Sequence, residues 1–199
     1  MLFRSMTGID FSGEAIAQAE ALAARTGTDI TYVRSTVEDA LTVLEPGAFD
    51  LVYTGIGALC WLPDVGGWAR IVAGLLRPGG RLFVRDVHPM LSAVDVVEGR
   101  LTPTMPYFEQ SAPTVWDEPG TYVATDHEFE TTTTHEWSHG LGEMVAALLA
   151  AGMEITDLAE HDSAPWNALK GLMTPDDHGE WRLVDAPERL AAKIGRAHV

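Results

Sequence analysis

The stretch LLRPGGRLFVRDVHP, Leu75–Pro89, decides the fold. It follows a run, Trp68–Leu76, in which apolar residues recur at intervals of three and four, as on one face of a helix. The Pro-Gly-Gly sequence at 78–80 ends that helix, because proline cannot continue the hydrogen-bond ladder and glycine turns freely. The apolar run Arg81–Val87 then predicts a strand. The stretch therefore predicts a helix, a turn and a buried strand in succession.

The same alternation precedes it. Gly13–Arg25 is rich in Ala and Glu and follows Ser12, which can cap free amides, so it predicts a helix. Residues 29–34 (DITYVR) predict a short strand, and 49–54 (FDLVYT) a strand buried on both faces of a parallel sheet. Helices and strands alternating at these spacings are typical of a doubly wound α/β sheet.

After His88 the alternation stops. Residues 88–134 hold scattered prolines, aromatics and β-branched runs, and we expect an inserted loop and hairpin that covers a substrate. Apolar residues then recur again at helical spacing, so we expect a helix with Ser138 as its N-cap and Gly152 as its C-terminal cap. Residues 153–159 predict one more strand.

Composition limits the class of protein. The 199 residues, 46% of them hydrophobic, suit a single globular domain. A formal net charge of −16 argues against nucleic acid as a partner, since binding phosphates relies on Lys and Arg. No apolar run predicts a membrane span or a signal peptide, and Cys60 is the single cysteine, so we expect a cytoplasmic location. Nothing in the residues fixes an oligomeric state.

Both ends lack periodicity and capping residues. We exclude residues 1–5 and 194–199 from the fold as non-native scars, which leaves one domain over 6–193. The chain is accordingly expected to be a fragment that lacks sequence at its N-terminal side.

HEWSH matches H-E-x-x-H, the zinc-hydrolase pattern that places His135, Glu136 and His139 on one helix face. Val145 stands where the longer pattern has a third histidine. The threonine run 131–134 favours a strand up to His135, and this would separate the two histidines at a helix boundary. We expect no metal site, and a zinc-dependent hydrolase remains an alternative.

A combination of features carries a family resemblance: GIDFS at 8–12 before a helix, then a strand with an acidic turn, FDLVYTGIGALCWLPD, and LLRPGGRLFV. It resembles the class I S-adenosylmethionine-dependent methyltransferases of small molecules, closely from Thr7 to Val87 and beyond His88 only in the last helix and strand. The resemblance implies a Rossmann-like sheet, S-adenosylmethionine as cofactor and a small-molecule methyl acceptor.

Site residues follow from the resemblance. It implies that Asp10 binds the ribose and that Phe11 packs near the adenine. The family's adenine-binding Asp falls at Thr36, which is followed by Val37 and Glu38, so the adenine contact departs from the family pattern.

The next strand ends in Tyr53, Thr54 and Gly55, which by the resemblance line the methionine part of the cofactor. The family's first strand and G-x-G-x-G loop are absent from the chain, so we expect the sheet to lack its first strand. We also expect these 199 residues to bind the cofactor weakly and to be unstable. A nicotinamide-dependent oxidoreductase is a second alternative, which the LLRPGGRLF turn and the absence of a G-x-G-x-x-G pattern both disfavour.

A general base would assist transfer to a hydroxyl or amine. His88, directly after a strand, is the first candidate, and His135 and His139 are the second. Aromatic residues of the insertion could form the acceptor pocket: Tyr107, Phe108, Trp116 and Tyr122.

Overall fold

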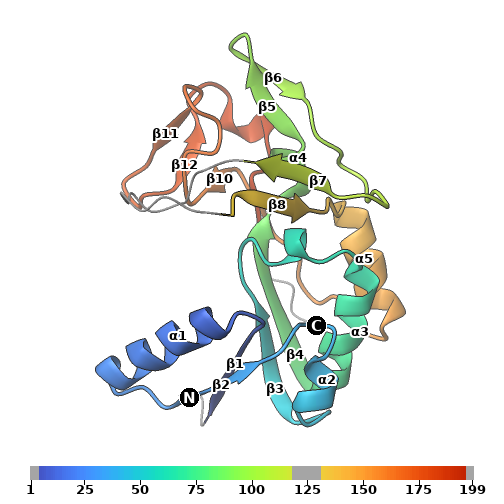
Figure 1. The fold of residues 1–199 in the computed structure, drawn as a ribbon. Coiled ribbons are helices and arrows are strands. Elements are labelled where there is room, and N and C mark those ends of the chain that lie inside the picture. Colours follow the sequence, from blue (N-terminus) through green and yellow to red (C-terminus); the bar gives the residue numbers. More distant parts are fainter. Residues whose placement is uncertain (1–4, 118–130, 196–199) are drawn as a thin grey trace.

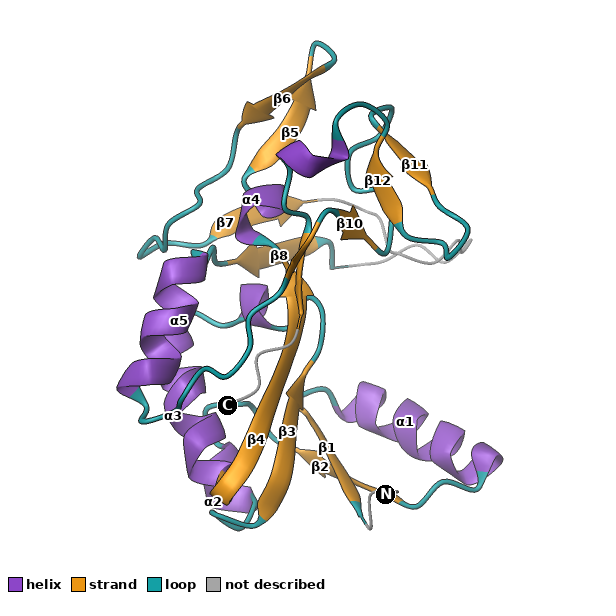
Figure 2. Ribbon diagram, turned by 180° about the vertical axis from the view of Figure 1, so that it is seen from behind, coloured by secondary structure: helices purple, strands orange, loops and turns teal. Residues whose placement is uncertain are grey.

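The computed structural model describes residues 5–117 and 131–195 (Figures 1 and 2). Tyr122 therefore lies outside the described residues. Helices and strands alternate up to residue 87, and short strands dominate afterwards. None of the helices in these two ranges has both the length and the apolar character needed to cross a bilayer.

The N-terminal residues form a β-α-β unit. Strand β1 (Met6–Asp10) lies parallel to β2 (Ile30–Arg34), and Asp10 is opposite Arg34. Between them runs α1 (Gly13–Thr26), whose N-cap Ser12 accepts a hydrogen bond from the Ala15 amide at 3.2 Å. The expected helix, its cap and the following strand are confirmed.

The central sheet has the order β3-β4-β13-β9. Strands β3 (Phe49–Thr54) and β4 (Leu76–Val87) are parallel, and β13 (Lys193–Gly195) pairs antiparallel with β4 and with β9 (Glu160–His161). Phe49 pairs with Leu76, but Leu51 pairs with Arg81, so residues 77–80 bulge out. The predicted Pro-Gly-Gly turn is thus a bulge at the start of β4.

One face of this sheet is covered by helices. The helix α3 (Val65–Leu75) packs against α5 (Leu141–Ala150), and the short α2 (Ala40–Val43) contacts α3 (Figure 1). Buried side chains of α3, β4 and α5 share one core, including Trp68, Val72, Leu82, Met144 and Leu148.

A second, β-rich layer lies at the carboxyl end of β4 (Figures 1 and 2). It begins with α4 (Pro89–Ser92) and two antiparallel pairs: β5 (Val94–Val97) with β6 (Arg100–Pro103), and β7 (Thr114–Asp117) with β8 (Thr133–Glu136). Strands β10 (Ser163–Ala164), β11 (Met173–Pro175) and β12 (Trp181–Leu183) form a further sheet. The short 3-10 helices are η1 (Leu59–Trp61) and η2 (Pro187–Arg189). This layer has its own buried cluster, which includes Leu91, Leu169 and Leu190.

Three expectations about the C-terminal part were wrong. Residues 153–159 form no strand, because β13 occupies the position beside β4. The helix begins at Leu141 rather than His139, and Glu143 caps it by accepting a hydrogen bond from the Gly140 amide at 2.6 Å, in place of Ser138. Ile194, which we excluded as part of a scar, is buried in the core and pairs with Asp86.

Candidate active site

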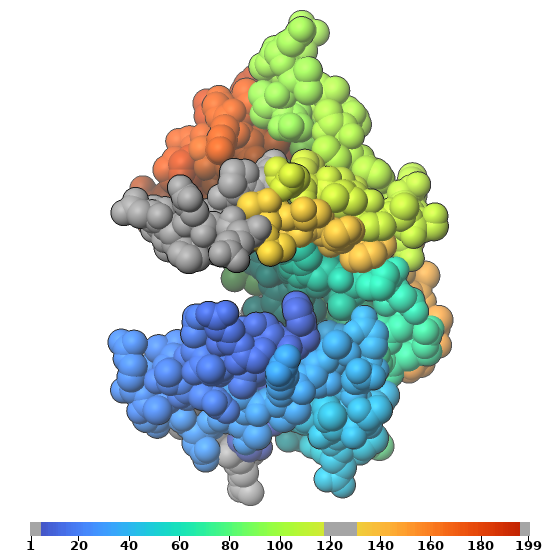
Figure 3. Space-filling model, in the orientation of Figure 1, coloured from blue at the N-terminus to red at the C-terminus, as the bar shows by residue number. Residues whose placement is uncertain are grey.

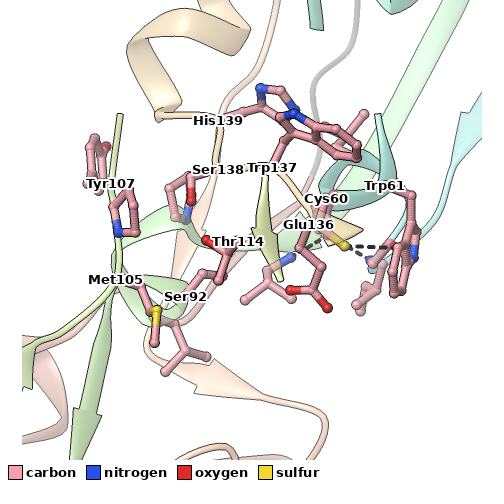
Figure 4. Close-up of a pocket in the computed structure, with 18 of the residues that line it drawn as sticks. Cys60, Trp61, Ser92, Met105, Tyr107, Thr114, Glu136, Trp137, Ser138 and His139 are labelled. Atoms are coloured by element: carbon pink, nitrogen blue, oxygen red, sulfur yellow. Dashed lines mark hydrogen bonds between the residues drawn. The ribbon is translucent and has the colours of Figure 1, made fainter. Parts of the chain in front are cut away.

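A cavity of about 730 Å³ lies where the β-rich layer meets the carboxyl ends of β3 and β4 (Figure 4). Its walls come from the loop after β3, the end of β4, strands β7 and β8, and the segment before α5. In Figure 3 a recess separates the blue N-terminal residues from the yellow residues of β7 and β8 above them. Aromatic and thioether side chains supply much of the lining: Trp61, Met105, Tyr107, Trp116, Trp137, Met144 and Trp166.

Asp86, the penultimate residue of β4, lines the cavity and is 6% exposed. Its Oδ1 accepts hydrogen bonds from the amides of Gly57 and Val87, both at 2.8 Å. Burial raises the pKa of this carboxyl, and the backbone hydrogen bonds and the nearby His139 oppose that rise only in part. Asp86 is therefore a better proton acceptor than an ordinary surface carboxylate.

Glu136, at the end of β8, also lines the cavity and lies near Cys60 (Figure 4). The Trp137 amide donates to the Cys60 carbonyl at 2.8 Å and so holds β8 against η1. Burial, together with Glu136 and Asp86, raises the pKa of the Cys60 thiol to about 12. The thiol stays protonated, so Cys60 packs rather than acting as a nucleophile.

His139 is the one predicted histidine that lines the cavity. Its Nε2 lies 2.7 Å from the Leu62 carbonyl oxygen, and because a carbonyl only accepts, Nε2 carries a proton and donates it. Its Nδ1 is buried and has no hydrogen-bond partner within the described ranges, while a Glu109 carboxylate oxygen lies 3.6 Å away. This arrangement fixes the ring beneath the loop after β3.

His88 and His135 do not line the cavity. His88 is buried, its Nδ1 accepts the Met90 amide at 3.0 Å, and its Nε2 lies 2.8 Å from Glu160. Both ring nitrogens are therefore engaged in capping α4 and pairing with Glu160. His135 is exposed on β8, opposite Val115. The structure does not bring the three histidines together.

A second, shallower pocket lies at the carboxyl ends of β1 and β2. Its lining includes Phe11, whose ring is 71% exposed, and Thr36. Asp10, exposed at the end of β1, accepts a hydrogen bond from the Ser12 amide at 2.7 Å. Arg34 donates to the Phe11 carbonyl at 3.1 Å and holds the two strand ends together.

Sequence reasoning missed Asp39, which lines this second pocket. The Thr36 hydroxyl donates to the Asp39 carboxylate and accepts from the Asp39 amide, both at 3.2 Å. A carboxylate therefore stands beside the position where the family's adenine-binding Asp was expected. The acidic turn RSTVED was the available signal. Val37 packs partly buried against the core, and Glu38 is exposed.

The carboxyl end of β3 carries Tyr53, Thr54 and Gly55. It lies between the strands of the second pocket, β1 and β2, and the loop that lines the cavity. The Tyr53 ring is 60% exposed and stacks with Phe83 at a centroid distance of 5.8 Å. Thr54 is buried. The exposed aromatic surface of Tyr53 is thus available to a ligand at this sheet edge.

Comparison with known proteins agrees with this geometry. Residues 2–82 match a family model described as a methyltransferase domain. A ubiquinone biosynthesis O-methyltransferase of Vibrio parahaemolyticus is 37% identical over 84 residues, which is 42% of this chain and 35% of that protein. The equivalent protein of Xanthomonas euvesicatoria is 35% identical over 94 residues, 46% of this chain and 38% of its own. The chain thus spans little more than a third of these curated relatives.

Solved structures match more of the chain. A provisionally assigned S-adenosylmethionine-dependent methyltransferase of Listeria monocytogenes superimposes with a TM-score of 0.65 at 17% identity, covering 98% of this chain and 79% of that one. An S-adenosylmethionine-dependent methyltransferase of Mesorhizobium loti gives 0.57 at 22% identity, covering 96% and 80%. At these identities the likeness concerns the fold. Residues 2–82 thus match a methyltransferase domain, and the chain as a whole has the fold of S-adenosylmethionine-dependent methyltransferases.

Proposed function

We propose that this protein transfers a methyl group from S-adenosylmethionine to a small molecule bound in the cavity. One observation carries the proposal: the pocket at the ends of β1 and β2, and the cavity at the ends of β3 and β4, lie at the carboxyl ends of parallel strands. In open α/β sheets ligands bind at that edge. A cofactor lying across the strand ends would have its adenosine in the pocket at the ends of β1 and β2 and its sulfonium near the cavity.

The residues at the adenosine end suit that group chemically. Asp10 can accept hydrogen bonds from ribose hydroxyls, and the exposed Phe11 ring can stack on adenine. Asp39, held by Thr36, can accept a hydrogen bond from the adenine amino group. Tyr53 and the loop from Gly55 are proposed to border the methionine part.

The cofactor supplies a methyl group on a sulfonium, which leaves as a neutral thioether. The protein's task is to align an acceptor and to take its proton. Asp86 and Glu136 are the carboxylates that line the cavity, and His88 is engaged elsewhere. We therefore propose Asp86 and Glu136 as proton acceptors, with His139 positioning the loop that bears Leu62.

We further propose that the protein is cytoplasmic and that its methyl acceptor is not a nucleic acid. We also propose that residues 88–134 form an insertion that covers the acceptor. The names of the curated relatives do not fix the acceptor here, because the matched segments cover less than half of this chain.

Isothermal titration with S-adenosylmethionine tests the proposal. Asp10→Ala and Asp39→Ala should each weaken binding, whereas Asp29→Ala, at an exposed aspartate away from both pockets, should not. Equal affinity in all four proteins would refute the placement of the cofactor.

A further inference from the structure

We propose that Glu143 is a positioning residue for acceptor binding, because it ties residues 105–110 to the start of α5 and thereby holds Tyr107 in the cavity wall. This inference rests on the proposed function only in taking the cavity as the acceptor site. Glu143 itself does not line the cavity, so it acts through the segment that it holds.

Residues 105–110 lie between β6 and β7 and form neither a helix nor a strand. Met105, Pro106 and Tyr107 line the cavity. The Met105 amide donates to the Ala93 carbonyl at 3.2 Å, which holds the beginning of the segment. Because the segment belongs to no strand, the position of its later residues depends on contacts with other elements.

The Glu143 carboxylate supplies such a contact. Both of its oxygens lie 3.2 Å from the Glu109 amide nitrogen, and Oε2 also accepts a hydrogen bond from the Gly140 amide at 2.6 Å. Hydrogen bonds to an ionised carboxylate are stronger than those between neutral groups. One side chain thus caps α5 and fastens the 105–110 segment to the same end of that helix.

Tyr107 packs against this helix end. Its hydroxyl accepts a hydrogen bond from the Leu141 amide at 3.3 Å. A Cβ atom on Gly140 would lie 3.0 Å from Tyr107 Cε1, so a glycine at this position leaves the ring its room. The ring also meets Phe108 edge-on at a centroid distance of 5.1 Å. Tyr107 therefore lines the cavity in an orientation that the start of α5 fixes (Figure 4).

The residues before α5 also hold a second wall of the cavity, the loop after β3. The Trp137 amide donates to the Cys60 carbonyl at 2.8 Å, and His139 Nε2 donates to the Leu62 carbonyl at 2.7 Å. Neither hydrogen bond involves Glu143. Removal of its carboxylate should therefore release the 105–110 segment and leave the loop after β3 in place.

Fluorescence titration with N-phenyl-1-naphthylamine, a neutral aromatic probe, tests the proposal without the cofactor. Glu143→Ala should weaken binding of the probe by about three- to tenfold, the scale of one aromatic contact. Glu143→Gln keeps an oxygen where Oε2 accepts from both amides, so its affinity should stay within about twofold of the parent. Ser12→Ala, the matched control, removes the N-cap hydrogen bond of α1 outside the cavity lining and should leave the affinity unchanged.

A double-mutant cycle with Tyr107→Ala locates the effect. If Glu143 acts by positioning Tyr107, each single variant weakens binding of the probe, and the double variant binds little more weakly than Tyr107→Ala alone. Gly140→Ala keeps the carboxylate but crowds the Tyr107 ring, so it should also weaken binding. This variant tests the same wall if Glu143→Ala fails to fold.

Additive losses in the cycle, equal weakening by Ser12→Ala, and a parent that does not bind the probe each overturn the proposal. The titration involves neither cofactor nor turnover. A protein that shows the expected pattern but transfers no methyl group therefore refutes the proposed function alone. Methyl transfer together with additive losses refutes the positioning role of Glu143 alone.

Discussion

The Oδ1 atom of Asp86 accepts a hydrogen bond from the Gly57 amide at 2.8 Å, which joins the end of β4 to the loop after β3. Gly57 has φ +77°, a conformation that disfavours residues with a side chain. The hydrogen bond to Asp86 and the glycine at position 57 together stabilise this conformation of the loop. The loop also separates Tyr53, at the end of β3, from Cys60 and Trp61 in the cavity wall.

Asp86→Ala should destabilise the protein. The substitution leaves the Gly57 and Val87 amides without their acceptor, at about 1 to 3 kcal/mol for each buried unsatisfied donor. Asp86→Asn keeps a carbonyl oxygen at the same place and should retain most of the stability. Chemical denaturation of the three proteins measures the difference, and equal losses in Ala and Asn variants would contradict the anchor role.

The stability of Asp86→Asn relative to the parent should depend on pH. Burial raises the pKa of Asp86 in the folded state, so its ionised form is disfavoured by folding. Protonated Asp86 therefore stabilises the folded state. This stabilisation is complete below the pKa that Asp86 has in the unfolded state, and it is lost as pH rises through the higher pKa of the folded state. The free energy of unfolding of Asp86→Asn, relative to that of the parent, should therefore increase from acidic to neutral pH. Thermal melts across that range test this, and a difference that shrinks as pH rises would oppose it.

Much of the N-terminal half was predictable because its signals are local. The Ser12 cap and the six-residue strand Phe49–Thr54 each depend on neighbouring residues alone. The C-terminal half was not, since β13 sits beside β4 through pairing of residues more than a hundred positions apart. A local pattern at 153–159 cannot reveal that another strand has taken that place.

The candidate site, too, was predictable from the sequence only in part. Phe11 and Thr36 line the second pocket, and Asp10 directly precedes Phe11 at the end of β1. Asp86 was missed as a cavity residue because it occupies a strand position with no distinguishing motif, and Glu136 was singled out only as part of HEWSH. The packing of β8 over η1 brings both residues to one cavity.

Asp39→Ala should reduce affinity for S-adenosylmethionine by about three- to thirtyfold, because the adenine amino group loses the carboxylate to which we propose that it donates a hydrogen bond. Asp10→Ala should cost about ten- to a hundredfold, since a carboxylate bound to ribose can accept two bonds. Sinefungin or S-adenosylhomocysteine titrations give the same test without turnover. If Thr36→Val weakens binding and Asp39→Ala does not, the adenine contact is the threonine hydroxyl.

Zinc should not bind at HEWSH with structural affinity. His135 is exposed on β8, while His139 is buried in the segment before α5, and its Nε2 already donates to Leu62. The described residues contain no group of three or more His, Cys, Asp or Glu placed to hold a metal. Elemental analysis of purified protein checks this. Stoichiometric zinc that disappears in a His135→Ala, His139→Ala double variant would prove the prediction wrong.

The last prediction concerns the edges of the two parallel strand pairs. Strand β1 is hydrogen-bonded to β2, and β3 to β4, so within the described residues β1 and β3 each keep one edge without a strand partner. Such edges expose backbone donors and acceptors and favour aggregation. A strand that filled this place would stabilise the sheet by an amount comparable with a domain's total of about 5 to 15 kcal/mol. We expect residues 1–199 to melt at lower temperature, and to gain less from S-adenosylmethionine, than a version in which an added strand and glycine-rich loop fill this place. Melts of both proteins with and without the cofactor measure this. If the 199-residue chain melts cooperatively and gains as much as the longer version, the added strand and loop are not needed to hold the cofactor.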